Sequence, residues 1–416
     1  MRARTGMRPR GATPVCALAI AFAAVAMLAA TPLAAPLAAQ QRDTTRADSA
    51  ARVAAERPFV RGGVYDKPFE NRIGSRTAFG GYAEAHARHE RVDGASDKSG
   101  FVAKRFNLFA SARVSDVIRF ASELEFEDGA SEIKLEFAAI DLRIHQAFAI
   151  RGGMILSPLG RFNLSHDSPL NEFTDRPLVS TEIIGVALSE PGFGALGQFR
   201  AGANGRVTYE AYATNGFHDG LVTSAEDGTR IPLGRGNFAD NNGSPAFVGR
   251  VAWSPVPSME FGVSGHRGAY NVFEADGIVV DDRRNATIVV ADVDFALGAT
   301  RIQGELALAT IDIPPGLAGI YASSQRGAYV EAVREFGKGL VRTLPSSAFA
   351  AKLRWDAVDF NTGVPGDGRM QLTAGLNFRP TRESVLKLDY VRGRARDEFN
   401  NRSDRAAFLL SLATYF

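Results

Sequence analysis

The sequence predicts an all-β protein, an antiparallel transmembrane β-barrel of about sixteen strands. Three observations point to this fold class. Apolar and polar residues alternate with a period of two from Thr77 almost to the C-terminus. The alternating segments are roughly 10–13 residues long, whereas strands of soluble sheets usually have five or six. The connections between them alternate between short turns and long loops, which is the arrangement of outer-membrane barrels.

The first 39 residues resemble a cleaved export signal in their organisation. Four arginines and no acidic residue precede an apolar stretch that runs from Val15 to about Leu33. The small residues Ala38 and Ala39 follow and offer a cleavage zone. The alternative is an uncleaved membrane anchor, but two prolines near the end of the apolar stretch count against it. We therefore expect residues 1–39 to be a signal peptide and the mature chain to lie in the outer membrane.

Residues 40–76 are polar and charged, with few apolar side chains to bury. We expect this segment to be a mobile periplasmic leader that precedes a barrel domain at residues 77–416. The single cysteine, Cys16, lies inside the signal, so disulfides and cysteine-bound metals are excluded from the mature chain. Removal of the signal leaves 44 basic and 46 acidic residues. This near-neutral balance gives no indication of nucleic-acid binding.

Each predicted strand is an alternating run between turn or loop residues. Phe106, Leu108 and Ala110, for example, alternate with Arg105 and Asn107. The predicted strands are 77–89, 101–113, 116–127, 131–143, 146–155, 196–203, 205–214, 246–254, 258–269, 286–298, 300–311, 326–336, 347–358, 368–379, 384–394 and 405–416. Because only a closed barrel satisfies all backbone groups in lipid, we expect an even number of strands.

The last strand, Ala406 to Phe416, alternates strictly and ends on an aromatic residue at the chain terminus. It resembles the C-terminal sorting strand of Gram-negative outer-membrane barrels, which implies the outer-membrane assembly machinery as a partner. The alternative is an ordinary last strand of a soluble sandwich. If Phe416 lies on the periplasmic side, nearly every long connection falls on the external side.

The connection at 156–195 is predicted to be the functional centre of the chain. A loop of about forty residues within a compact fold is unusual and is often functional. It is the third external loop, and we expect it to fold into the barrel and narrow the lumen. The alternative is an external flap that stays outside. The residues predicted at the constriction are Arg161, His166, Asp167, Glu172, Asp175 and Arg176.

A family resemblance is carried by Leu124–Glu127, Ile140–Leu142, Arg151–Asn163 and Asp175–Val179. These stretches are similar to the phosphate-selective porin O and P family and its uncharacterised relatives. The resemblance covers about residues 120–200. It implies a Gram-negative outer-membrane porin with sixteen strands, which is often trimeric and passes anions.

A phosphate pathway needs a file of arginines and lysines along the lumen, because these replace the hydration shell of an anion. The alternation also places Glu123, Glu125, Asp292 and Glu305 on the inward face, so the lumen is of mixed charge and phosphate specificity does not follow. The basic residues predicted to line the pore are Arg105, Arg113, Arg119, Arg151, Lys352 and Arg354.

Three short motifs are weak candidates for other chemistry. Residues 192–197 match the glycine pattern of dinucleotide sites but enter a strand without a following helix. His86 and His89 fall on opposite faces of a strand and cannot share one metal ion. Ser264 and His266 lie near a GxSxG-like stretch, and in the alternative of an outer-membrane lipase they would lie on the lipid-facing wall. No catalytic residue, cofactor or metal is predicted.

The sequence therefore predicts a porin, not an enzyme, that forms a passive channel for small hydrophilic solutes, with anions such as phosphate among the candidates. Pore diameter, the inward loop and the balance of luminal charges would select the solute. Two alternatives stay open: a plugged structural or adhesive barrel, and an outer-membrane hydrolase. The expected partners are outer-membrane lipid, solutes or ions, the assembly machinery and two further copies in a homotrimer.

Overall fold

The computed structural model describes Val64, Lys67 and residues 71–73, 76–222 and 228–416. The predicted signal and most of the predicted leader lie outside these residues. Among the helices of the described part, none has the length and apolar character needed to cross a bilayer.

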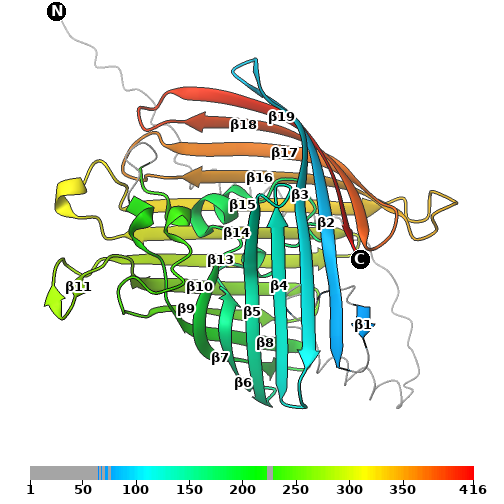
Figure 1. Cartoon of the computed structure of the whole chain (residues 1–416). Helices are drawn as coiled ribbons and strands as arrows, with labels where there is room; N and C mark the ends of the chain where they lie inside the picture. The colour runs from blue at the N-terminus through cyan, green and yellow to red at the C-terminus, as the bar shows by residue number, and fades with distance from the viewer. Residues whose placement is uncertain (1–63, 65–66, 68–70, 74–75, 223–227) are drawn as a thin grey trace, which may run out of the picture. The chain divides into compact units, whose positions relative to one another are not determined.

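Sixteen long antiparallel strands form one closed sheet (Figure 1). Each strand pairs with its neighbour in sequence, and β19 pairs with β2 from Arg405↔Val92 to Tyr415↔Tyr82, which closes the barrel. The predicted fold class and the even strand number are confirmed. The strands are β2 (Thr77–Val92), β3 (Ala95–Arg113), β4 (Ile118–Glu127), β5 (Glu132–His145), β6 (Phe148–Leu156), β7 (Ser189–Ala201), β8 (Gly205–Thr214), β9 (Ala246–Ser254), β10 (Met259–Ala269), β13 (Asn285–Leu297), β14 (Thr300–Ile311), β15 (Ser324–Phe336), β16 (Ala348–Asp359), β17 (Gly368–Arg379), β18 (Ser384–Arg396) and β19 (Arg402–Tyr415).

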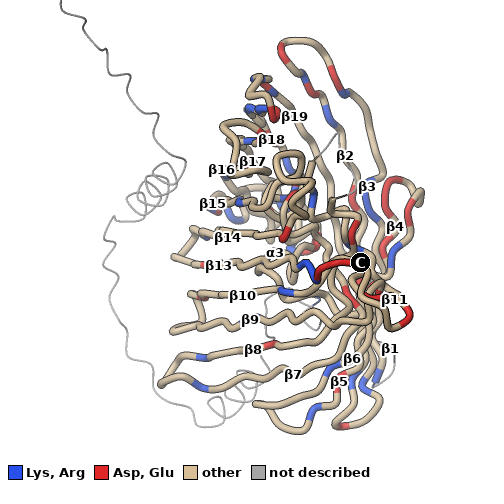
Figure 2. The backbone as a smooth tube through the Cα atoms, turned by 90° about the vertical axis from the view of Figure 1, so that its left-hand side faces the viewer, with Lys and Arg blue, Asp and Glu red and all other residues tan. Residues whose placement is uncertain are grey.

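The two faces of the sheet differ in the way that the alternation predicts. On β19, Phe408, Leu410 and Leu412 are exposed on the outer face, whereas Leu409 and Ser411 are buried on the inner face. Charged residues are scattered along the strands (Figure 2). Outward aromatic rings contact one another near the short-turn end, as in a membrane-interface belt. The pairs are Phe199–Tyr209, Trp253–Phe261, Phe336–Phe349 and Phe349–Phe378.

Two connections differ from the prediction. Residues 90–100 form the tight end of the β2–β3 hairpin instead of a loop, because Asp93 and Gly94 both have positive φ angles and make a two-residue turn. The hairpin projects beyond its neighbours in Figures 1 and 2. β7 begins at Ser189 and not at residue 196. Pro191, Gly192 and Gly194 resemble loop residues in sequence, yet here they pair in register with β6.

Short elements complete the described part. β1 (Asn71–Ile73) pairs with Thr77–Phe79 of β2 and continues the line of β19 past its end. The remaining elements lie in the longer connections and are two small strands, one short α-helix, one π-helix and three 3₁₀ turns. They are β11 (Glu274–Ala275), β12 (Ile278–Val279), α3 (Arg161–Leu164), η1 (Ser180–Ile184), η2 (Asp219–Val222), η3 (Ile231–Gly234) and η4 (Pro315–Leu317).

Candidate functional site

The connection between β6 and β7, residues 157–188, lies inside the barrel, and we call it the constriction loop. Its backbone N–H groups donate to carboxylates on the inner wall. Phe162 donates to Glu305 (2.6 Å) and Thr174 donates to Asp389 (2.8 Å). These acceptors stand on β14 and β18, which are four strands apart in the barrel. The loop therefore crosses the lumen.

Basic side chains of the wall also hold the loop, by donating hydrogen bonds to its backbone carbonyl oxygens. Lys352 donates to the carbonyl oxygen of Glu172 (2.6 Å), and Lys387 donates to that of Ser168 (2.8 Å). Arg354 donates to the carbonyl oxygen of Asp175 (3.0 Å). Because buried backbone groups must be paired, these wall residues take the place of secondary-structure hydrogen bonds for the loop.

Arg161 anchors the first turn of the constriction loop. Its guanidinium lies 2.7 Å from Glu260 and 2.9 Å from Asp294, and the side chain is buried. Two carboxylates hold this charge, so it is largely neutralised toward a passing ion. Arg161 was predicted to lie at the constriction, and its contacts are those of an anchor.

Glu172 anchors the middle of the constriction loop, as Arg161 anchors its first turn. Its carboxylate accepts hydrogen bonds from Asn377 (2.7 Å) and Arg379 (3.2 Å). Burial acts to raise the pKa of Glu172, but Arg379 and the nearby Lys352 lower it more, so the net shift is downward. Glu172 therefore stays ionised and holds the loop to β17.

Asp167 is held by two residues from different parts of the chain, Lys67 and Tyr415. Lys67, from the segment before β1, lies 2.7 Å from Asp167 and 2.8 Å from Glu123, and its side chain is only 4% exposed. Tyr415 on β19 donates to the other oxygen of Asp167 (2.9 Å). The ammonium group also lies 4.8 Å from the centre of the Phe109 ring. Burial lowers the pKa of Lys67, but the two carboxylates raise it more, so it remains charged.

The sequence analysis missed Lys67. Val64 also packs inside the barrel, against a cluster that includes Phe137 and Leu164. The predicted periplasmic leader therefore differs from the structure at these two positions, which lie within the barrel. The alternating pattern begins only at Thr77, and a lone lysine in a polar segment carries no signal of burial. A search for isolated cations opposite the surplus of inward glutamates could have raised the possibility.

His166 is buried between the loop backbone and the wall. Its Nδ1 lies 2.8 Å from the carbonyl oxygen of Asn163, and its Nε2 lies 3.0 Å from Glu136. Burial, followed by the nearby Arg176, lowers the pKa of His166 to about 4. The imidazole is therefore neutral at neutral pH, with its position fixed by two partners.

This shift predicts a pH dependence of stability. In the unfolded chain His166 binds a proton below its ordinary pKa, whereas in the folded chain it binds one only near pH 4, so the folded state loses stability as the pH falls between these values. Between pH 7 and pH 5 the expected loss from this group is about 2 kcal/mol. Urea unfolding in detergent micelles at both pH values measures it. In the His166→Asn variant the difference between the two pH values should shrink by that amount; an unchanged difference contradicts the assignment.

An apolar core fills one side of the lumen at the long-loop end. Ile183 and Ile184 of η1 pack with Leu221 and Ile231 from the connection between β8 and β9. Arg235 from the same connection donates to the carbonyl oxygen of Gly185 (2.7 Å). This part of the constriction loop is thus packed against the connection between β8 and β9.

Two cavities flank the constriction loop. The larger, of about 1000 Å³, lies among β2, β3, β17, β18 and β19 and is lined by eight Lys or Arg residues and five Asp or Glu residues. We call it the outer vestibule. The smaller, of about 490 Å³, has five basic and four acidic lining residues, and we call it the inner vestibule. Asp175 lines both, so the two cavities approach each other at this residue.

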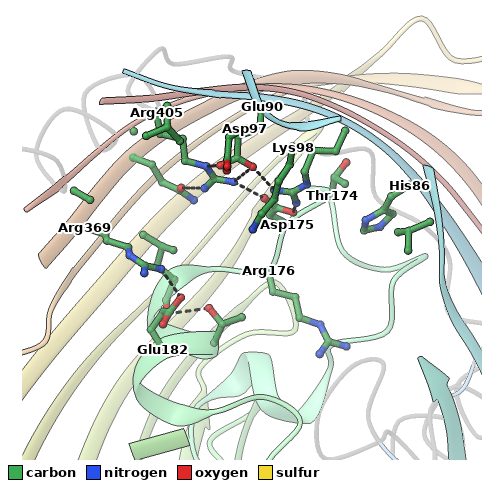
Figure 3. Close-up of a pocket in the computed structure, with 18 of the residues that line it drawn as sticks. His86, Glu90, Asp97, Lys98, Thr174, Asp175, Arg176, Glu182, Arg369 and Arg405 are labelled. Atoms are coloured by element: carbon green, nitrogen blue, oxygen red, sulfur yellow. Dashed lines mark hydrogen bonds and ion pairs between the residues drawn. The ribbon is translucent and has the colours of Figure 1, made fainter. Parts of the chain in front are cut away.

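The outer vestibule contains one arginine that lies outside the ion-pair network of its neighbours (Figure 3). Asp175 is held by Arg88 and, at 3.8 Å, by Arg405, and Arg405 also pairs with Glu90. Arg176 stands apart from this network in Figure 3. Its Nε and one terminal nitrogen are buried and have no hydrogen-bond partner among the residues described. Arg176 forms no ion pair among the described residues, although Glu125 and Glu136 of the wall lie near enough to interact with its charge.

The residues predicted to line the pore all lie on the inward face by strand register, but most are held in ion pairs. Arg105 lies 2.9 Å from Glu84, and Arg151 lies 2.7 Å from Asp141. Lys352 lies 2.6 Å from Asp389 and Arg354 lies 2.9 Å from Asp356. The other two, Arg113 and Arg119, are opposite each other in the register of β3 and β4 at the short-turn end.

The position of Ser264 and His266 on the lipid-facing wall, which the lipase alternative implies, is wrong. Both side chains are buried on the inner face of β10. Ser264 accepts a hydrogen bond from the N–H of Gly160 (2.9 Å), and His266 lies 3.0 Å from Glu190. Each has a structural partner, and the pair is not assembled into a nucleophile–base arrangement. The residues of the described part hold no group of three side chains suited to a metal ion.

Comparison with known proteins supports the fold. No family model matches the chain. An uncharacterized protein from Aquifex aeolicus (strain VF5) is 25% identical over 368 residues, which cover 79% of this chain and 78% of that protein.

Among solved structures, an anion-selective porin from Comamonas acidovorans has a TM-score of 0.54 at 11% identity, covering 82% of this chain and 99% of that one. The outer membrane channel DcaP of Acinetobacter baumannii has a TM-score of 0.53 at 14% identity, covering 84% and 99%. OprB of Pseudomonas putida has a TM-score of 0.53 at 10% identity, covering 82% and 94%. At these identities the likeness establishes the fold that the chain shares with outer-membrane porins.

Proposed function

We propose that this protein is an outer-membrane porin, a passive channel for small hydrophilic solutes with a preference for anions. The apolar outer face suits lipid and the polar inner face suits water. The observation that carries the anion preference is Arg176, whose guanidinium lies in a vestibule with more basic than acidic lining residues and has no carboxylate partner among the described residues.

The mechanism follows from the electrostatics of a narrow water-filled passage. An anion loses part of its hydration shell at the constriction, and a guanidinium can replace it with N–H donors. Asp175 would repel the anion at the junction of the two vestibules, but Arg88, Arg354 and Arg405 surround its carboxylate or its carbonyl oxygen. The negative charge of Asp175 is therefore offset by these neighbouring guanidinium groups.

Phosphate specificity is not part of this proposal, although the resemblance to phosphate-selective porins suggests it. Arg105, Arg151, Lys352 and Arg354 are each neutralised by an acidic neighbour. A continuous file of free cations would require several of these charges to be released. A general preference for small anions fits the observed pairing better.

We also propose that Phe416 and the short turns face the periplasm, that β19 is recognised by the outer-membrane assembly machinery, and that three copies associate. A plugged structural or adhesive barrel is the alternative that the dense seating of the constriction loop favours. Both proposals predict membrane insertion, but only the channel conducts.

The test is a planar bilayer with the purified full chain in a potassium chloride gradient. We expect discrete conductance steps and a reversal potential shifted from zero toward the chloride equilibrium potential. When phosphate replaces chloride, the reversal potential should shift in the same direction. Insertion without any conductance step supports the plugged barrel and overturns the channel. A reversal potential shifted toward the potassium equilibrium potential supports a channel but overturns the anion preference.

A further inference from the structure

The outer face of the β18–β19 hairpin carries a cluster of arginines around one carboxylate. Arg402 and Asp404 approach to 2.6 Å, Arg394 lies 3.5 Å from the same carboxylate, and Arg392 lies 4.0 Å from it. Three guanidinium groups thus gather around one carboxylate, and Arg402 also interacts with the charge of Asp93. A lone carboxylate cannot satisfy three such groups, each of which carries five N–H donors.

Strand register places these side chains on the outward face of the sheet, and Arg394 also borders the outer vestibule. Arg402 and Asp404 share a face of β19 with the exposed residues Phe408 and Leu410, and Arg392 shares a face of β18 with Tyr390. The side chains of Arg392, Arg394 and Arg402 are 59%, 44% and 46% exposed. Their donors are therefore available to a partner that approaches the barrel from outside.

The cluster stands at the edge of the apolar belt. Arg392 and Arg394 lie across from Leu372 and Met370 of β17, both of which are exposed and apolar. One step toward the short-turn end, Tyr390 and Phe408 form an aromatic pair with ring centres 4.9 Å apart. At a membrane interface, arginines typically pack their aliphatic part on apolar residues and direct the guanidinium to water, next to a belt of aromatic residues. The position of this cluster fits that arrangement.

Other charges near the hairpin leave the cluster basic. Arg91 of β2 lies across from Ala406 and adds a guanidinium to the same face. Asp93 accepts from the backbone N–H of Asp404, and Asp397 accepts from Asn401 at the hairpin turn. Glu398 also lies in this turn, outside β18 and β19. Arg396 is used within the hairpin, where it donates to Asn400.

We propose that Arg392, Arg394 and Arg402 bind the phosphate groups of a phosphorylated glycolipid in the outer leaflet. A phosphate monoester carries up to two negative charges and three acceptor oxygens, and guanidinium groups bind it in a bidentate manner. The glycolipid's acyl chains would lie on Leu372, Met370 and the aromatic pair, which a free phosphate ion could not use. This inference rests on the proposed membrane placement but not on ion selectivity.

The experiment measures co-purification of lipid A with the full chain in detergent micelles, read by native mass spectrometry. Wild-type protein is mixed with lipid A that carries both phosphates, with dephosphorylated lipid A, and with inorganic phosphate as a competitor. The test variant is Arg392→Gln/Arg402→Gln. The control is Arg267→Gln, an outward arginine on β10 that donates to Thr287 and forms no ion pair among the described residues. Heat-modifiable gel mobility verifies that each variant is folded.

We expect the double variant to retain at least about fivefold less phosphorylated lipid A than wild type, and Arg267→Gln to retain as much as wild type. Asp404→Asn should act in the opposite direction, because it removes the competing carboxylate. Equal retention by the double variant and wild type overturns the site. Equal retention of phosphorylated and dephosphorylated lipid overturns phosphate recognition, and full displacement by millimolar inorganic phosphate assigns the site to the free ion instead of the lipid. Because Arg392 and Arg402 lie outside the vestibules, a failed anion preference in the bilayer would leave this result unaffected.

Discussion

Replacing Arg176 by glutamate is expected to abolish or reverse the anion preference of the channel. Arg176 is the guanidinium in the outer vestibule whose Nε and one terminal nitrogen lack partners among the described residues. The substitution changes the local charge by two units. At ~7 Å from a permeating ion each unit is worth about 0.6 kcal/mol in bulk water, and more between low-dielectric walls, so the permeability ratio should change roughly tenfold.

Reversal potentials in a potassium chloride gradient measure the ratio. Arg176→Gln, which removes one unit of charge, should fall between wild type and Arg176→Glu. Arg267→Gln, whose side chain is exposed on β10 and donates to Thr287, should leave the ratio unchanged. If Arg176→Glu conducts with the wild-type reversal potential, Arg176 does not face the ion path and the proposed basis of selectivity is wrong.

The barrel could be predicted because the same physical pattern repeats along the whole wall. Each strand must be apolar outside and polar inside, so β17 was predicted at 368–379 and found at Gly368–Arg379, and β16 shifted by only one residue. The strand bounds were predicted wrongly where residue types that are typical of loops occur within or next to a strand. Asp93 and Gly94 make a two-residue turn between long strands, and Pro191 and Gly192 begin a strand.

The lumen could be predicted only in part. Alternation predicts which side chains point inward, and Arg105 and Arg354 of that predicted set are buried. It does not identify their partners, because those depend on strands and loops that meet only after the barrel closes. Arg161 contacts Glu260 and Asp294, which lie 99 and 133 residues further along the sequence. The sequence therefore does not show that Arg161 is held in ion pairs whereas Arg176 forms none among the described residues.

Replacing Lys67 by methionine is expected to destabilise the seating of the constriction loop by about 3–5 kcal/mol, because a buried carboxylate pair loses its shared cation. Asp167 belongs to the loop and Glu123 to β4, so the ammonium group joins loop and wall. Without it the two acids repel each other, and Tyr415 alone continues to hold Asp167 to β19. The expected readouts are a lower urea midpoint and larger fluctuations of the single-channel current.

Second-site variants separate this mechanism from a general loss of packing. In Lys67→Met/Asp167→Asn the repulsion is gone, so much of the loss of stability should be recovered, although Val64 and the cation–ring contact with Phe109 are affected equally in both variants. Lys338→Met, at an exposed lysine between β15 and β16, provides a matched control that should resemble wild type. If the double variant is no more stable than Lys67→Met, then packing of the segment before β1, and not charge, ties the loop to the wall. If Lys67→Met itself has the wild-type midpoint and a quiet current, Lys67 does not hold the constriction loop, and its burial between two carboxylates is without consequence for the channel.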